Sequence, residues 1–242
     1  MISLRDCLAP AALCIAFTLA GCSQQGSAPT QAQAKAQADA AAANANLETY
    51  RQLLRIPNDE MAVTMGKEIV SRFPDSAAAK EVQQTLPEIE QRYKENSEKT
   101  RLAALWWYQV APMAGGKQST ATIRNSHPGS AEPVKLVLRR HTAWGQSVFL
   151  YGSGHGFVCR RTCTLALTVD GKSVHIKAFA PPTGEPALMF SDDKGFIAML
   201  RKAREISIGV TLVDGNKKQT LVYEVGGFDP AKWLELGKPK KR

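Results

Sequence analysis

Apolar residues recur at every third or fourth position between residues 47 and 93, which is the spacing of amphipathic helices. A first stripe over residues 47–56 stops at Pro57, and Asn58 suits the N-cap of a second helix. The inward face of that second helix is expected to carry Met61, Met65, Ile69 and Phe73 as core residues rather than as a peptide groove. Ser76 can cap a third helix, which we expect Pro87 to interrupt because proline disfavours helical geometry in the residue before it. The pattern predicts two or three helices over residues 47–103.

From residue 104 onward the pattern changes to short alternating runs separated by Gly, Pro, Ser and Asn, which indicates strands. The clearest pair spans residues 165–178, where Asp170-Gly171 supplies a tight turn between two alternating arms. A last hairpin has Asp214-Gly215 at its tip, and the short helix before it is expected to point Phe196, Ile197, Leu200 and Ala203 inward. Seven to nine such strands predict an α+β chain, in which the helical segment is followed by an antiparallel β-sandwich or small barrel over residues 104–236 with one inserted helix.

The N-terminal apolar run, residues 8–20, is too short for a helix that needs about 20 residues to cross a bilayer. One basic residue, Arg5, precedes the run and small residues end it, which is the layout of a secretory signal peptide. The ending, Leu19-Ala20-Gly21-Cys22, resembles the lipobox of bacterial lipoproteins. The resemblance implies that residues 1–21 are removed and that Cys22 carries a diacylglycerol; the alternative is an ordinary signal peptide with a chance cysteine.

Two or three acyl chains on Cys22 would hold the mature protein on a membrane, since each buried CH₂ contributes about 0.8 kcal/mol. Ser23 follows the cysteine, and by analogy with lipoprotein sorting it favours the outer membrane, facing the periplasm. Residues 22–46 are rich in Gln, Ala, Ser and Asn and are expected to form a flexible tether. The basic residues 237–242 are expected to be a disordered tail.

The cysteine count agrees with an oxidising compartment. Of five cysteines, Cys7 and Cys14 leave with the signal peptide and Cys22 carries lipid, so Cys159 and Cys163 remain to form one disulfide. A straight strand would hold their Cα atoms about 13 Å apart, so the chain must turn sharply between them. The turn would present Arg160 and Arg161 to an anion or a partner; the alternative is a solvated turn without a ligand.

Two further stretches resemble known families. Residues 71–82, "SRFPDSAAAKEV", resemble the link between helix pairs in tetratricopeptide-like envelope lipoproteins. The likeness covers about one repeat, so it implies a helical hairpin rather than a repeat array. The order of cysteine-bearing strands, hairpin, Gly-Phe-x-x-x-Leu helix and final strands is similar to that of invasion-associated envelope proteins of the locus B type.

Motifs for chemistry are weak throughout the chain. Residues 152–156 are rich in glycine, but a strand rather than the helix of a phosphate loop is expected to follow. Ser191 and Lys194 have the Ser-x-x-Lys spacing of penicillin-binding enzymes without the other elements, so Ser191 is expected to be a helix cap. His155, Cys159 and Cys163 would gather as zinc ligands only on a helix. We therefore expect no cofactor, no metal and no catalytic residues.

A net charge of +9 favours anionic partners, although the charge alone would also keep the protein soluble. Nucleic acid is excluded as a partner by the envelope compartment and by the lack of a recognisable RNA-binding motif. The leading hypothesis is a lipid-anchored, non-catalytic binding or assembly module that contacts an envelope protein or an anionic envelope component. The alternatives are an inhibitor or immunity protein against an envelope-targeting toxin and, less favoured, an envelope-polymer hydrolase.

Overall fold

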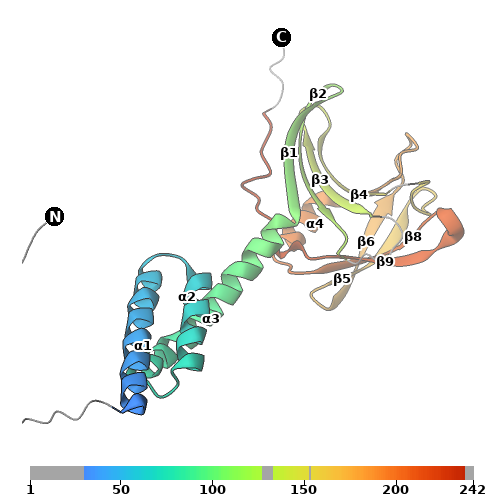
Figure 1. Ribbon diagram of the computed structural model, residues 1–242. Helices are drawn as coiled ribbons and strands as arrows, with labels where there is room; N and C mark the ends of the chain where they lie inside the picture. The colour runs from blue at the N-terminus through green and yellow to red at the C-terminus, as the bar shows by residue number, and fades with distance from the viewer. Residues whose placement is uncertain (1–29, 127–132, 153, 238–242) are drawn as a thin grey trace, which may run out of the picture.

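The chain folds into a three-helix unit joined to a β-rich part by one long helix (Figure 1). The computed structural model describes residues 30–126, 133–152 and 154–237. Within them no helix is both long and apolar enough to span a membrane. The helices are α1 (Gln31–Arg55), α2 (Asp59–Arg72), α3 (Ala77–Ala104) and α4 (Asp193–Leu200), with short 3₁₀ turns η1 (Asp214–Asn216) and η2 (Val225–Gly227). The strands are β1 (Trp106–Met113), β2 (Gly116–Arg124), β3 (Lys135–His141), β4 (Gly145–Tyr151), β5 (Cys163–Val169), β6 (Lys172–Phe179), β7 (Ala187–Phe190), β8 (Ile206–Thr211) and β9 (Lys218–Tyr223).

Side-chain caps begin the three N-terminal helices where polar residues precede apolar stripes. Asn58 accepts from the Met61 N–H and Ser76 from the Ala79 N–H, as predicted for both residues, and Thr30 forms a capping box with Gln33. The helices pack around a core of their own, whose fully buried members include Tyr50, Ile69 and Val82.

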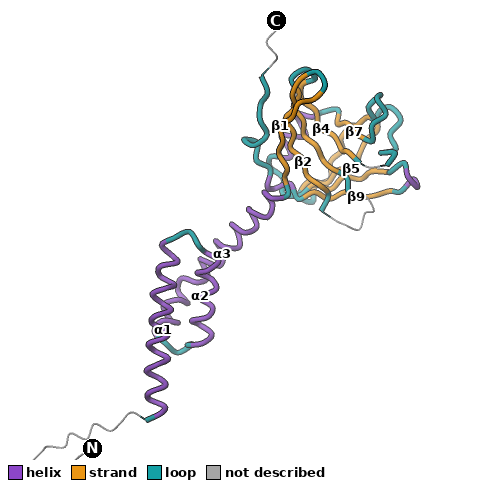
Figure 2. The backbone as a smooth tube through the Cα atoms, turned by 45° about the horizontal axis from the view of Figure 1, so that its top comes forward, coloured by secondary structure: helices purple, strands orange, loops and turns teal. Residues whose placement is uncertain are grey.

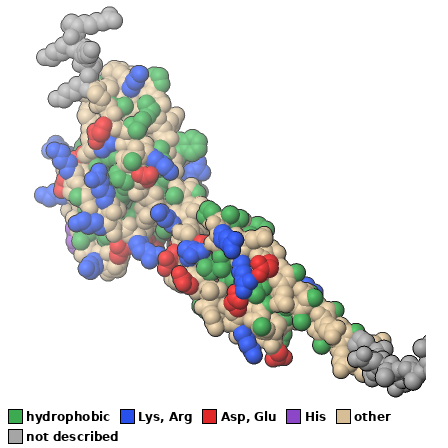
Figure 3. Space-filling view, turned by 90° about the vertical axis from the view of Figure 1, so that its left-hand side faces the viewer, with side chains coloured by type: hydrophobic (Ala, Val, Ile, Leu, Met, Phe, Trp, Pro, Cys, Tyr) green, Lys and Arg blue, Asp and Glu red, His purple; other side chains and the backbone are tan. Residues whose placement is uncertain are grey.

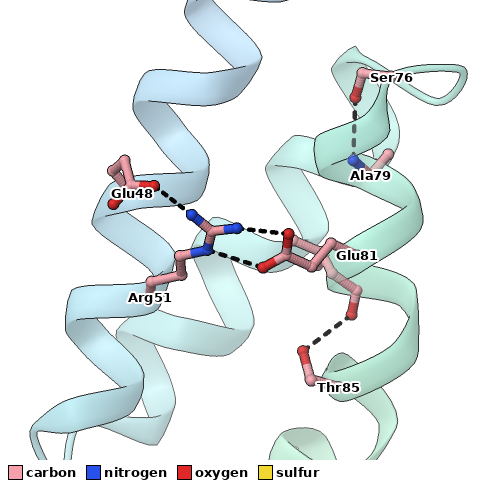
Figure 4. Close-up of polar contacts among 7 residues, drawn as sticks. Glu48, Arg51, Ser76, Ala79, Glu81 and Thr85 are labelled. Atoms are coloured by element: carbon pink, nitrogen blue, oxygen red, sulfur yellow. Dashed lines mark hydrogen bonds and ion pairs between the residues drawn. The ribbon is translucent and has the colours of Figure 1, made fainter.

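Polar contacts add to this helical core. The Arg51 guanidinium donates two hydrogen bonds to Glu81 across α1 and α3, and Glu48 also accepts from it (Figure 4). The Tyr50 hydroxyl lies 2.8 Å from the Thr85 hydroxyl. The Arg51 pair holds the pKa of Glu81 below its usual range through the hydrogen bond and the nearby charge.

Three expectations about the helical segment are wrong. Residues 31–46, expected to be part of the flexible tether, belong to α1, because alanine has the highest helix propensity and Ala43 packs in the core. Pro87 does not interrupt α3, since buried Val82 and Ile89 hold the helix against the bundle on both sides of it. Met61 is 55% exposed rather than part of the core stripe.

The last turn of α3 attaches the helical unit to the β-rich part, as the tube in Figure 2 shows. Gly227 lies so close to α3 that a Cβ atom there would come within 2.2 Å of the Leu102 carbonyl. Arg101 on α3 donates to Glu224 beside η2, which lowers the pKa of that carboxyl. Backbone contact and an ion pair therefore fasten the same junction.

The β-rich part is one nine-stranded antiparallel sheet in the order β1-β2-β3-β4-β7-β6-β5-β8-β9. Its core contains α4 and the buried Trp233, whose indole N–H donates to the Ser119 carbonyl. Phe196, Ile197, Leu200 and Ala203 are all buried, as predicted. Both predicted hairpins are present, with Asp170 and Gly171 at positive φ in the first and η1 in the second.

The mixed α+β class is confirmed, and the sheet is not closed, because β1 and β9 are edge strands. Two local expectations are wrong. Phe157 forms an isolated bridge with Leu212 instead of starting a strand, because the loop lies against the end of β8, where the Val158 N–H donates to the Thr211 carbonyl. Asp192 rather than Ser191 caps α4, since the Ser191 N–H still bonds the Lys177 carbonyl of β6.

Candidate functional site

Strands β1, β2, β3, β4 and β7 are covered by core on only one face. Alternate residues such as Ile123, Leu136 and Leu150 point into the core. The residues between them face a groove of about 1310 Å³ on the other side of the sheet. This groove is our candidate binding site.

Apolar side chains form the floor of the groove. Antiparallel register aligns Trp107, Thr122, Val137, Phe149 and Met189 in one row across five strands. We call Trp107, Val137, Phe149 and Met189 the apolar row. Val137 and Phe149 form a second, smaller hydrophobic cluster with Ala187 and Met189, separate from the main core. A surface groove therefore has a floor of core-like composition.

Exposed aromatic side chains also line the groove. Trp107 is 68% exposed, Trp144 54% and Tyr151 41%, and all three line the groove. Large aromatics this exposed that line one groove are typical of binding surfaces, because their apolar faces gain most from being covered.

Trp144 is held in place by the buried His141. The Nδ1 atom of His141 accepts from the N–H groups of Ala143 and Trp144 at 3.1 and 3.2 Å, and the two rings stack with centroids 3.9 Å apart. Because Nδ1 accepts both bonds, it carries no proton in this arrangement.

Cations flank the apolar row on both sides. Arg124 and Lys135 are directly opposite each other on β2 and β3. Lys135 is two residues before Val137 along β3, so this pair lies on the same face as the apolar row and next to it. On the other side, Arg139 has its guanidinium over the Phe149 ring at 5.0 Å and the Trp144 ring at 5.4 Å.

The environment of Arg139 is only partly polar. Its Nε donates to the Ser147 hydroxyl at 3.2 Å. Burial lowers the pKa of Arg139, and the negative charge of Glu185 partly opposes that shift. Among the described residues, no carboxylate forms an ion pair with Arg124, Lys135 or Arg139.

The charge of the whole β-rich part has the same sign. Residues 104–242 hold twenty Lys and Arg against ten Asp and Glu, whereas residues 30–103 hold ten against eleven. Figure 3 shows this difference on one face, where blue side chains gather over the β-rich part and alternate with red ones over the helices.

The residues predicted as sites lie elsewhere or outside the described residues. Cys22 and the basic residues 238–242 are outside them. The Cα atoms of Cys159 and Cys163 are 5.6 Å apart with their sulfurs at disulfide distance, so the chain makes the sharp turn that was expected. Arg160 and Arg161 are exposed in that turn and do not line the groove.

The other motifs form no larger site in the part of the chain that is described. His155 contacts Asp214 through its backbone N–H at 3.0 Å and through its ring, which lowers the pKa of the aspartate. No group of three His, Cys, Asp or Glu residues is placed to hold a metal ion in the described residues.

Sequence reasoning missed the groove, although one signal for it was present. The runs "LVL" in β3, "VFL" in β4 and "ALMF" in β7 are apolar at consecutive positions, whereas a strand with one solvated face alternates. Consecutive apolar residues indicate that both faces of these strands are covered or are used for binding.

Comparisons with known proteins give a weak structural likeness. No protein-family model matches the chain, and no curated protein matches it in sequence. A solved structure, the invasion associated protein B of Bartonella henselae, is similar with a TM-score of 0.36 and 19% identity over 52% of this chain and 88% of that one. This likeness agrees with the resemblance to the locus B type drawn from the strand and helix order.

Proposed function

We propose that the protein is a non-catalytic binding module of the bacterial envelope and that the groove over β1–β4 and β7 is its binding face. The observation that carries the proposal is the groove itself, where the apolar row lies at the bottom and the exposed Trp107, Trp144 and Tyr151 line the opening. The apolar surface of these three aromatic side chains is costly to leave in water, so a ligand or partner that covers it gains free energy.

The partner in this proposal is an anionic envelope component. Three cations line the groove without a carboxylate partner among the described residues, and residues 104–242 have twice as many basic as acidic side chains. Complementary charge both attracts such a partner and fixes its position.

The N-terminal part of the chain provides the attachment in this proposal. In it, Cys22 carries the lipid, and the mature chain is held on the outer membrane facing the periplasm.

 The helix α3 has 28 residues and is therefore about 42 Å long at 1.5 Å per residue. The helical unit would therefore act as a spacer that keeps the groove away from the lipid headgroups.

The same proposal covers the finer shape of the β-rich part, which we describe as an incomplete barrel. The support is that the Ser126 N–H, just after β2, donates to the Val222 carbonyl of β9 at 2.7 Å, so the two ends of the sheet approach each other there. Such curvature leaves the groove open on the outside of the sheet while the core fills the inside.

Photocrosslinking in living cells tests the proposed binding face. A photoreactive phenylalanine analogue at Trp107 should form adducts with an envelope component. The same analogue at Val213, which is 44% exposed outside the groove, is the matched control. Equal labelling at both positions, or none at Trp107, would contradict the proposal.

The anchor is tested separately. Replacing Cys22 by Ser should abolish lipid labelling and release the protein from the membrane fraction, and unchanged membrane retention would contradict the lipid anchor.

A further inference from the structure

We propose that the groove holds one molecule of an anionic phospholipid, with an acyl chain along the apolar row and the phosphate at Arg124 and Lys135. This inference rests on the proposed function, because it names the ligand of the same binding face. Three features of the groove point to this ligand class.

The first feature is the direction of the apolar row. Trp107, Val137, Phe149 and Met189 lie in one line across the strands, perpendicular to the strand direction, with Thr122 between the first two. Five strands at about 4.8 Å spacing make a path of about 19 Å. A long, narrow apolar ligand such as an acyl chain matches a path of this shape.

The second feature is the arrangement of the cations. Like charges directly opposite each other on neighbouring strands are destabilising, and Arg124 is opposite Lys135. Arg139 is partly withdrawn from water over two aromatic rings, with the Ser147 hydroxyl as its hydrogen-bond partner. A phosphate near Arg124 and Lys135 would relieve their repulsion and supply charge-assisted hydrogen bonds, while Arg139 adds positive charge on the other side of the row.

The third feature is that most backbone hydrogen-bonding groups of the floor are already used. β2 and β3 pair with a strand on both sides, and β4 pairs with β3 along its length and with β7 over Phe149–Tyr151. A bound peptide would need such groups for its own backbone, and the open edge of β1 lies two strands away from Arg139 on β3. An acyl chain requires no hydrogen bonds, so the floor favours a lipid over an acidic peptide.

Titration calorimetry on the mature chain carrying Cys22→Ser tests this inference. The probes are short-chain phosphatidic acid below its micelle concentration, the diacylglycerol with the same chains, and inorganic phosphate. We expect phosphatidic acid to bind at least about tenfold more tightly than either of the other two, because only it meets both the apolar row and the cations.

Variants locate the site. Arg124→Gln with Lys135→Gln should weaken phosphatidic acid binding by about tenfold and reduce its salt dependence. The matched control, Arg160→Gln with Arg161→Gln, removes the same charge outside the groove and should change the affinity less than about twofold. Circular dichroism of both variants checks that they remain folded.

Several results would overturn the inference. Diacylglycerol binding as tightly as phosphatidic acid would remove the role of the cations, and inorganic phosphate binding as tightly would remove that of the apolar row. An equal loss of affinity in the control variant, or tighter binding of an acidic amphipathic peptide, would also overturn it. Adducts at Trp107 without lipid binding would reject only this inference, whereas the absence of both would reject the proposed function as well.

Discussion

The helical part and the β-rich part of the chain differ in how their charges are compensated. In the helical part, cations such as Arg51 and Arg92 pair with carboxylates on neighbouring helices. In the β-rich part, Arg124, Lys135 and Arg139 line a groove without such pairs among the described residues. The helical part balances much of its charge through its own ion pairs. The three cations of the groove lack such pairs, which agrees with the proposed anionic ligand.

The two parts also differ in how they use apolar side chains. The helices bury theirs in one shared core, and the sheet buries one set in a core and leaves a second set on a groove. Val137 and Phe149 are buried at the bottom of that groove, whereas Trp107, Trp144 and Tyr151 are exposed. Exposed aromatic surface adds no stability to the fold, which agrees with the proposed binding role. These differences agree with the proposed roles, in which the helical part is a spacer and the sheet carries the binding groove.

The largest expected effect tests whether the helical core acts separately from the groove. Ile69→Ala removes a fully buried side chain from that core and should lower the free energy of unfolding by about 2–5 kcal/mol. Thermal unfolding followed by circular dichroism measures the loss. The affinity of the groove for its ligand should stay unchanged, and a parallel loss of affinity would show that the two parts are coupled.

The next effect tests the junction between the two parts. Gly227→Ala places a Cβ atom within 2.2 Å of Leu102 backbone atoms, where neither side can yield easily. We expect destabilisation at the upper end of about 1–3 kcal/mol, measured by chemical denaturation. Gly237→Ala is the matched control, since nothing lies within 4 Å of a Cβ atom there. Equal stability of both variants would mean that the last turn of α3 does not need this close approach.

A third effect concerns the β-rich part alone. Closing the short loop between Cys159 and Cys163 should contribute about 2 kcal/mol on the chain-entropy estimate. Replacing both cysteines by serine should therefore lower the stability of this part by that amount and leave the helices unaffected. Alkylation of the purified mature protein under non-reducing conditions checks the bond itself, and two free thiols would refute it.

The smallest expected effect is the pH dependence of the ion pairs. Glu81 and Asp59 are paired with Arg51 and Arg92, and each pair lowers the pKa of its carboxyl. Their contribution to stability is therefore present above about pH 4 and is lost as the pH falls through the lowered pKa values.

Melting curves between pH 7 and pH 2 should show this loss in the wild type. The variant Glu81→Gln with Asp59→Asn should lose less on acidification, by an amount smaller than the disulfide effect, because these pairs are exposed. An identical pH dependence of the wild type and the variant would show that the pairs contribute nothing measurable.

Much of the local structure could be predicted from the sequence because it depends on neighbours along the chain. The caps Asn58 and Ser76, the Asp170-Gly171 turn and the inward face of α4 all follow from short-range rules. The start of α1 was missed although its alanines favour helix locally, and the continuity of α3 through Pro87 was missed because packing between helices overrode local preference there.

The groove is the feature that only the tertiary structure decided. Trp107, Val137, Phe149 and Met189 come from four strands that are distant in sequence, and antiparallel register aligns them in one row. Arg124 is likewise opposite Lys135 only because β2 pairs with β3. The sequence by itself determined the helical segment, the strands and their turns, through spacing and turn chemistry. Which strands became neighbours, and therefore which side chains share the groove, depended on contacts between distant residues, and no periodicity along one chain specifies these.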